Sequence, residues 1–248
     1  MARRSLFVAA GVAAFLVCVV AMIPADQLAR RLPPGAAMTA VGGTIWSGRA
    51  ARLTVEGTSL GAIEWFCRPW ALLRLGWSCH IMLAPEGGEL RGNLSGDFAG
   101  GDIVGGDISG RLPIAAFEGV ATPRGWTGFL ELDIDQLRIA EGRPTLATGT
   151  AFVRGLRAPG PTGQPLGDFE LVIGEGAVGA GTLGGRLRDL GGPLRVRGAL
   201  TVRPDGNYLL TGECAPGPGA GPAIFDTLAF LGTPDRLGRR PFTIEGSL

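Results

Sequence analysis

Apolar residues alternate with small or polar residues through most of this chain, and this alternation limits the fold more than any other sequence feature. It is clear in residues 52–56, RLTVE, and again in residues 130–135, LELDID. Successive side chains of a β-strand point to opposite faces, so a period of two residues is typical of half-buried strands. Helical spacing is hard to sustain between the N-terminal apolar stretch and residue 220. The chain is therefore predicted to be all-β.

Glycine and proline turns punctuate this alternation. They include residues 160–163, GPTG, and residues 204–207, PDGN, whose Asp-Gly pair favours a tight hairpin. A hydrophobic content of 46% argues against disorder, despite 43 glycines and 18 prolines in 248 residues. We predict a meander of many short antiparallel strands that forms an extended curved sheet or a sandwich. The predicted strands are 41–50, 88–94, 101–108, 128–139, 145–153, 167–173, 181–187, 193–202, 207–213 and 241–248.

Two segments interrupt the strands. Residues 64–75 carry bulky side chains without a pattern, and Pro69 suits a first helical residue, so a short helix or an aromatic-lined loop is predicted there. Residues 222–231 place Ile224, Leu228 and Leu231 on one helical face. We expect a short helix at this second position.

An uncharged apolar stretch, residues 6–23, follows Arg3 and Arg4 near the start of the chain. It is long enough to cross a bilayer core of about 30 Å, and its basic flank favours the cytoplasmic side. A cleaved signal peptide is the competing interpretation, but a convincing small-x-small site is missing before Pro24. A lipoprotein signal through Cys18 is weaker, because bulky residues precede that cysteine. We expect an uncleaved transmembrane anchor.

The predicted organisation has four parts. A cytoplasmic stub, residues 1–5, precedes the anchor, residues 6–23, and a proline-containing linker, residues 24–40. Residues 41–248 contain no second apolar stretch of comparable length, so they should form a β-rich domain on the far side of the membrane. In a bacterium with two membranes, that side is the periplasm.

Charge excludes one large class of partners. The chain carries 23 basic and 22 acidic residues, a formal net charge of +1, and every basic residue is arginine. So balanced a charge gives no long-range field that would attract nucleic acid. The absence of lysine also excludes Schiff-base and phosphate-loop lysine chemistry.

Cys67 and Cys79 are the natural disulfide pair in an oxidising compartment, because Cys18 lies inside the predicted anchor. A bridge closing a loop of this size stabilises a fold by roughly 3 kcal/mol. Free buried thiols remain the alternative, and Cys214 is a competing partner. The spacing indicates no metal site, because His80 is the single histidine.

The sequence offers no assembled catalytic group. Asp133 and Asp135 fall on one face of a predicted strand, where solvation is the simpler explanation, because neither a nucleophile nor an oxyanion donor accompanies them. Glycine-rich pieces such as residues 100–106 match no phosphate-binding spacing. We predict no enzyme activity, no catalytic residue and no cofactor.

The five tryptophans are concentrated in the first third of the chain. Trp65, Trp70 and Trp77 form a candidate aromatic contact patch, while core packing is the alternative role for most of the tryptophans.

Two motifs stand near the ends of the β-rich part. The first is residues 43–48, GTIWSG, followed by the tryptophan-rich residues 64–77. The second is residues 228–246, in which a Leu-Gly-x-Pro turn leads to a final strand. This order of features resembles the N protein family of the bacterial type II (general) secretion pathway. The motif positions are Gly43, Thr44, Trp46, Gly48, Leu231, Gly232, Pro234, Gly238 and Gly246.

The resemblance implies an accessory inner-membrane component of the type II secretion machinery. Such a protein supports export of folded periplasmic proteins through contacts with other machine subunits, in the inner-membrane platform or the secretin. The resemblance implies no catalysis, and it assigns no role to the cysteine pair. We therefore expect a single-pass inner-membrane protein with its bulk in the periplasm, whose exposed sheet edges recruit partners by strand addition.

Two other hypotheses fit the same pattern. An AsmA-like or lipopolysaccharide-transport-like protein would use an anchored curved sheet as an apolar groove for a lipid ligand. An anchored periplasmic hydrolase is the third hypothesis, and the single histidine argues against it.

Overall fold

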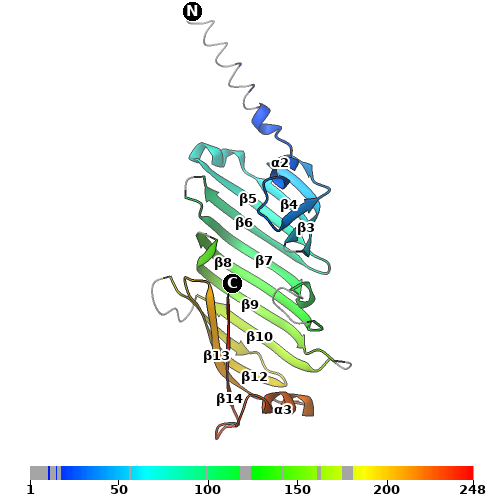
Figure 1. The fold of residues 1–248 in the computed structure, drawn as a ribbon, viewed down its shortest axis with the longest axis vertical. Coiled ribbons are helices and arrows are strands. Elements are labelled where there is room, and N and C mark those ends of the chain that lie inside the picture. Colours follow the sequence, from blue (N-terminus) through cyan, green and yellow to red (C-terminus); the bar gives the residue numbers. More distant parts are fainter. Residues whose placement is uncertain are drawn as a thin grey trace, which may run out of the picture.

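A computed structural model describes residues 11, 15, 18–55, 57–98, 100–117, 124–140, 142–160, 163–174 and 181–247. These residues form one 14-stranded sheet in which consecutive strands pair from β3 onward (Figure 1). The predicted all-β antiparallel meander is confirmed, as one sheet rather than a sandwich. The strands are β1 (Ala36–Thr39), β2 (Gly42–Gly43), β3 (Ser47–Val55), β4 (Thr58–Cys67), β5 (Gly76–Ala84), β6 (Glu89–Asp97), β7 (Ile103–Pro113), β8 (Thr127–Ala140), β9 (Arg143–Arg157), β10 (Pro165–Ile173), β11 (Leu183–Asp189), β12 (Leu194–Val202), β13 (Asn207–Pro216) and β14 (Arg240–Ser247).

Short helical elements lie between or before the strands. Pro69 is the first residue of a 3-10 helix, and proline also begins the helix near the C-terminus, where its fixed φ suits a first helical position. These two elements match the two predicted interruptions. The helical elements are α2 (Asp26–Ala29), η1 (Pro69–Arg74), η2 (Ile114–Phe117) and α3 (Pro222–Ala229).

Two segments near the N-terminus differ from the predicted structure. The predicted strand through residues 44–46 is a hairpin turn between β2 and β3, closed by the Thr44 amide, which donates to the Ser47 carbonyl at 2.9 Å. Residues 64–67 belong to β4, although their bulky side chains show no alternation. Trp65 is buried while the neighbouring Phe66 is 49% exposed, so both faces of this strand end carry large apolar groups.

The two faces of the sheet differ in chemistry. Aliphatic residues and glycines follow one face from strand to strand: Leu94 of β6 lies opposite Gly105 of β7, which lies opposite Leu137 of β8. Further along, Leu132 of β8 lies opposite Ala151 of β9. We call this the inner face, because the core side chains lie on it.

Four charged side chains and one phenylalanine form a row on the outer face that crosses five strands. Arg111, Glu131, Phe152, Glu170 and Arg188 lie opposite one another in turn from β7 to β11. Arg111 Nε lies 3.7 Å from Glu131 Oε1, and Arg188 pairs with Glu170. The hydrogen bond from Arg188 lowers the pKa of Glu170. Ion pairs therefore satisfy charged groups on the outer face, whereas the inner face of these strands is mainly apolar, with Asp189 opposite Phe169 as an exception.

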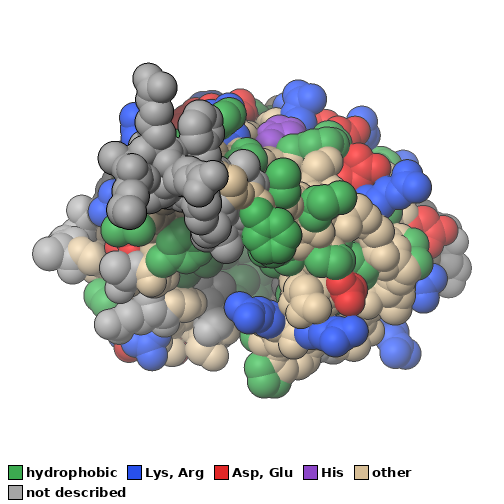
Figure 2. Space-filling view, turned by 90° about the horizontal axis from the view of Figure 1, so that it is seen from above, with side chains coloured by type: hydrophobic (Ala, Val, Ile, Leu, Met, Phe, Trp, Pro, Cys, Tyr) green, Lys and Arg blue, Asp and Glu red, His purple; other side chains and the backbone are tan. Residues whose placement is uncertain are grey.

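The sheet curls over its inner face toward the C-terminal end. Val153 of β9 and Phe242 of β14 pack against one buried cluster, although four strands separate β9 from β14. Figure 1 shows β13 and β14 crossing the direction of the central strands. Figure 2, which views the molecule from its N-terminal end, shows a hollow bordered by hydrophobic side chains. The cluster is built on Phe169, Val196, Cys214, Ile224 and Leu228.

A second core joins the start of the sheet to the segment that precedes it. Ala25 is 1% exposed and packs with Ala50, Ile63 and Trp65. The Ala25 amide donates to the Gly43 carbonyl at 3.1 Å, so the predicted linker, residues 24–40, begins inside packed structure and also contains α2 and β1.

The predicted anchor, residues 6–23, lies largely outside the described residues. Its described part includes residues 18–21, which are helical. Within the part of the chain that is described, no helix is long and apolar enough to cross a membrane.

Candidate functional site

A large apolar groove lies on the inner face where the sheet curls. Its volume is about 890 Å³, within the range of roughly 300 to 1,000 Å³ usual for ligand pockets. Strands β9 to β14 form its walls, and α3 lies along it. We call it the α3 groove. Its lining residues include Val153, Leu156, Leu166, Phe169, Leu187 and Leu210.

Helix α3 is held in the groove by one face. Ile224 and Leu228 are 2% and 3% exposed, because they point into the cluster on the sheet. Phe225 and Phe230 on other faces are 51% and 91% exposed. The groove is therefore partly filled by the helix, and its remaining walls stay open to a ligand or to solvent.

Polar groups at the C-terminal end of the groove are few. Cys214 is buried, and its Sγ donates to the carbonyl of Arg240 at 3.5 Å. Burial raises the pKa of this thiol, against a smaller opposing effect of the Arg240 charge. A thiol kept protonated in an apolar site is unsuited to nucleophilic chemistry, so Cys214 acts here as a small hydrophobic side chain.

A smaller cavity of about 420 Å³ lies at the N-terminal end of the sheet. We call it the N-terminal cavity. Leu28 of α2, Leu72 of η1 and Phe98 after β6 meet around it, together with Trp46 and Trp77. Cys67 and Cys79, paired on β4 and β5, also line it and are joined by a disulfide.

The candidate aromatic patch is divided between the core and the surface. All five tryptophans lie in described residues, and Trp65 is the buried one, at 3% exposure. Its Nε1 donates to the Thr44 carbonyl at 3.2 Å. Trp70 is 77% exposed, and Trp77 is half-buried. Trp65 is therefore a packing residue, which leaves Trp70 as the openly exposed member of the patch.

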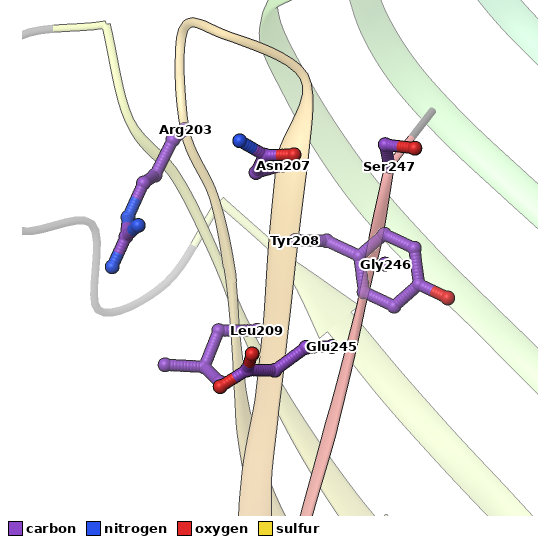
Figure 3. Close-up of a pocket in the computed structure, with 7 residues that line it drawn as sticks. All are labelled: Arg203, Asn207, Tyr208, Leu209, Glu245, Gly246 and Ser247. Atoms are coloured by element: carbon purple, nitrogen blue, oxygen red, sulfur yellow. The ribbon is translucent and has the colours of Figure 1, made fainter.

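Gly48 and Gly246, one from each motif, have no room for a side chain, and the reason is the same in both cases. A Cβ on Gly48 would lie 2.8 Å from Cε2 of Trp65, and a Cβ on Gly246 would lie 2.5 Å from Cζ of Tyr208. In both cases the ring of the neighbouring strand covers the glycine, as Figure 3 shows for Tyr208. Each ring takes the space that a side chain would need. The motifs thus mark packing near opposite ends of one sheet.

The turn that joins α3 to β14 contains three positions of the second motif, Gly232, Pro234 and Gly238. Asp235 organises it, because its Oδ1 accepts the amides of Leu237 and Arg239 at 2.8 Å each. The hydrogen bond from the Arg239 backbone is the main reason that the pKa of Asp235 is lowered. Gly232 also takes part, since its carbonyl accepts Nε of Arg240 at 3.0 Å. These residues shape the entry to the last strand.

Strand β14 is the C-terminal edge of the sheet and pairs with β13 alone among the described strands. Beside this edge lies a shallow depression of about 450 Å³ (Figure 3). Arg203 and Glu245 give it charge of both signs, and Leu209 lies between them. Strand β1, only four residues long, forms the other edge.

The residues considered for catalysis do not come together. Asp133 and Asp135 are exposed on the sheet, and Ser109 and Thr150 are the strand neighbours of Asp133. Nδ1 of His80 lies 3.0 Å from Asn93 Oδ1 on another part of the outer face. The described residues contain no cluster of His, Cys, Asp and Glu suited to a metal ion.

The lipid-binding hypothesis includes an apolar groove but names no residue of it, and the predicted contact patch includes Trp70 but not the exposed Leu73, Leu75 and Phe98. The groove residues carry a partial signal: Leu194 and Val196 alternate on β12, whereas Leu166 and Phe169 of β10 are separated by register shifts. Their convergence depends on the curl of the sheet, which alternation does not encode.

The described strands form one open antiparallel sheet, and an apolar groove lies on its inner face. Comparison with known proteins identifies the family. The sequence profile of the family described as "Type II secretion system (T2SS), protein N" matches residues 34–243. The chain belongs to this family.

Two curated relatives carry the name "Type II secretion system protein N". The relative from Aeromonas hydrophila is 30% identical over 269 aligned residues, which cover all of both chains. The relative from Vibrio cholerae serotype O1 is 27% identical over 231 residues, which cover 88% of this chain and 87% of the relative. No solved structure matches the chain.

Proposed function

We propose that this chain is an accessory inner-membrane component of the type II secretion machinery that supports export of folded proteins through contacts with other subunits. Membership of the protein N family carries the proposal. The apolar residues 6–23 supply the anchor, and the sheet extends from it into the periplasm. The inner-membrane platform and the secretin are the candidate partners.

The edges of the sheet supply a physical means of contact. An edge strand carries unpaired backbone donors and acceptors on its free side, which can pair with a strand of another subunit. Strand β14 is the longer edge, with eight residues, and its outward residues Thr243 and Glu245 are exposed. This edge is the contact site that we favour.

A second function is favoured by one observation, the apolar α3 groove. An apolar cavity of about 890 Å³ suits the hydrocarbon chain of a lipid, because such a ligand requires no hydrogen bonds from the walls. In that case the protein would be a periplasmic lipid-binding component, of the AsmA-like or lipopolysaccharide-transport-like kind.

One purification distinguishes the two functions. The full chain is tagged, extracted gently from membranes of its own bacterium and purified, and the bound proteins and lipids are measured by mass spectrometry. We expect secretion subunits to co-purify. Stoichiometric lipid without secretion subunits would contradict the first function and support the second.

Two variants show whether any bound lipid lies in the groove. Ile244→Arg places a charge in its wall, so it should lower the bound lipid. Ser247→Arg adds the same charge at an exposed position of the same strand outside the groove, so it should leave the lipid unchanged. Equal lipid in both variants would exclude the groove as the binding site.

A further inference from the structure

Large apolar side chains are exposed together at the N-terminal end of the sheet. Trp70, Leu73 and Leu75 are 77%, 83% and 75% exposed, and Phe98 is 64% exposed. Phe98 lies beside Leu75, because its amide donates to the Leu75 carbonyl at 3.1 Å. We call these four residues the η1 patch. Trp70 and Leu73 also line one depression. Exposed apolar side chains grouped at one end of a sheet are typical of an interaction surface.

The η1 patch is tied to the apolar N-terminal segment by a short chain of contacts. Trp46 Nε1 donates to the Val20 carbonyl at 2.8 Å, and the Trp46 carbonyl accepts the Cys67 amide at 2.6 Å. A disulfide joins Cys67 to Cys79, and the Arg68 amide donates to the Ser78 carbonyl at 2.8 Å. These two links join the chain before η1 to the chain after it. The patch therefore has a fixed position relative to residue 20.

Figure 1 places η1 at the end of the sheet from which the N-terminal segment leaves. In Figure 1 the cyan turn before β5 lies at this end, while α3 lies at the opposite end. Figure 2 looks onto the N-terminal end and shows hydrophobic side chains gathered there. A membrane crossed by residues 6–23 would therefore face the patch.

Leu75 combines an unfavourable backbone conformation with an exposed apolar side chain. Leu75 ends η1 in the left-handed conformation, with φ 55° and ψ 33°, which is unfavourable for a side chain other than glycine or asparagine. Leu75 gains little burial in return, since it is 75% exposed. A surface that covers Leu75 would recover the missing hydrophobic stabilisation.

Two arginines add positive charge beside the η1 patch. Arg68 and Arg74 border a depression of about 640 Å³ that is also lined by Trp70 and Leu73. Both arginines are exposed, and among the described residues neither takes part in an ion pair. Tryptophan and leucine beside arginine suit the boundary between acyl chains and anionic headgroups.

We propose that the η1 patch inserts into the surface of the membrane that residues 6–23 cross, with Arg68 and Arg74 against phospholipid phosphates. This inference rests on the proposed membrane anchor. The partner is the lipid bilayer itself, because the anchor brings that surface to the patch. The sheet would then be attached to the membrane at two points, the anchor and η1, which fixes its orientation.

A depth measurement on the full chain tests this contact. The chain, with Cys18→Ser and Cys214→Ala, is reconstituted in vesicles of phosphatidylethanolamine and phosphatidylglycerol. An NBD fluorophore is attached to Leu73→Cys or, as the control, to Phe230→Cys, whose native side chain is 91% exposed at the far end. We expect spin-labelled lipid to quench the probe at 73 roughly threefold or more above the probe at 230, and iodide to show the opposite order.

Each other outcome overturns a defined part of the proposal. Equal iodide quenching at both positions, in vesicles that retain the chain at alkaline pH, overturns the membrane contact and leaves the anchor intact. Release of the chain at alkaline pH overturns the anchor and the contact with it. Protection from iodide without lipid quenching means that protein, rather than lipid, covers the patch.

The arginines are tested in the same vesicles. Arg68→Gln with Arg74→Gln should reduce lipid quenching at 73, as should omission of phosphatidylglycerol. Arg236→Gln with Arg203→Gln, two exposed arginines outside the N-terminal end, is the matched control and should have no effect. An equal effect of both pairs would contradict a phosphate contact at η1.

Discussion

Replacing Trp65 with alanine should lower the free energy of unfolding by about 3 to 5 kcal/mol, the usual cost of removing a buried aromatic side chain. Trp65 is 3% exposed, packs with Ala25, Ala50 and Ile63, and covers Gly48. Its loss would leave a cavity where the N-terminal segment joins the sheet. Urea unfolding of the detergent-solubilised chain, followed by circular dichroism, measures the change.

Trp70→Ala is the matched control for this prediction. The side chain is 77% exposed, so its truncation should change the free energy of unfolding by less than about 0.5 kcal/mol. Similar losses in the two variants would show that Trp65 is not the packing centre of the N-terminal core. Trp65→Phe should fall between the wild type and Trp65→Ala.

Removing the disulfide should cost about 3 kcal/mol, as expected for a closed loop of this length. Cys67 and Cys79 are separated by 12 positions in the chain and enclose η1. The double variant Cys67→Ser with Cys79→Ser therefore has a less restricted unfolded state. The same urea titration measures the loss.

A reductant provides the internal control for the disulfide prediction. It should lower the unfolding midpoint of the wild type to that of the double variant and leave the double variant unchanged. A wild-type midpoint that does not move, in a sample whose Cys67 and Cys79 thiols are shown to be free, would contradict a stabilising role for the bridge.

Local sequence patterns predicted several elements closely. The pattern predicts a strand at residues 207–213, and β13 is Asn207–Pro216. It predicts a helix at residues 222–231, and α3 is Pro222–Ala229. In both cases the signal is local: an Asp-Gly turn precedes the strand, and apolar residues at helical spacing follow the proline.

Strand β5 was not among the predicted strands, although it lies between two other strands. Ile81, Met82 and Leu83 are consecutive apolar residues, so the alternation is blurred. The adjoining segment, residues 64–75, combines a strand end with a 3-10 helix and has no single period. Pattern reading fails where apolar residues occupy both faces of an element.

The sequence could not predict how the sheet closes on itself. Alternation shows which residues share a face, and Val153 and Phe242 each belong to such a set. That the two residues pack against one cluster depends on accumulated twist between β9 and β14. For the same reason the α3 groove is a property of the folded sheet rather than of any one segment.

Export of folded proteins by the source bacterium gives the most direct test of a role in type II secretion. A strain that lacks this chain is compared, by pulse labelling, with the same strain supplied with the full chain. We expect exported proteins to accumulate in the periplasm of the deletion strain and the full chain to restore their release. Equal rates of release with and without the chain would contradict the proposed function.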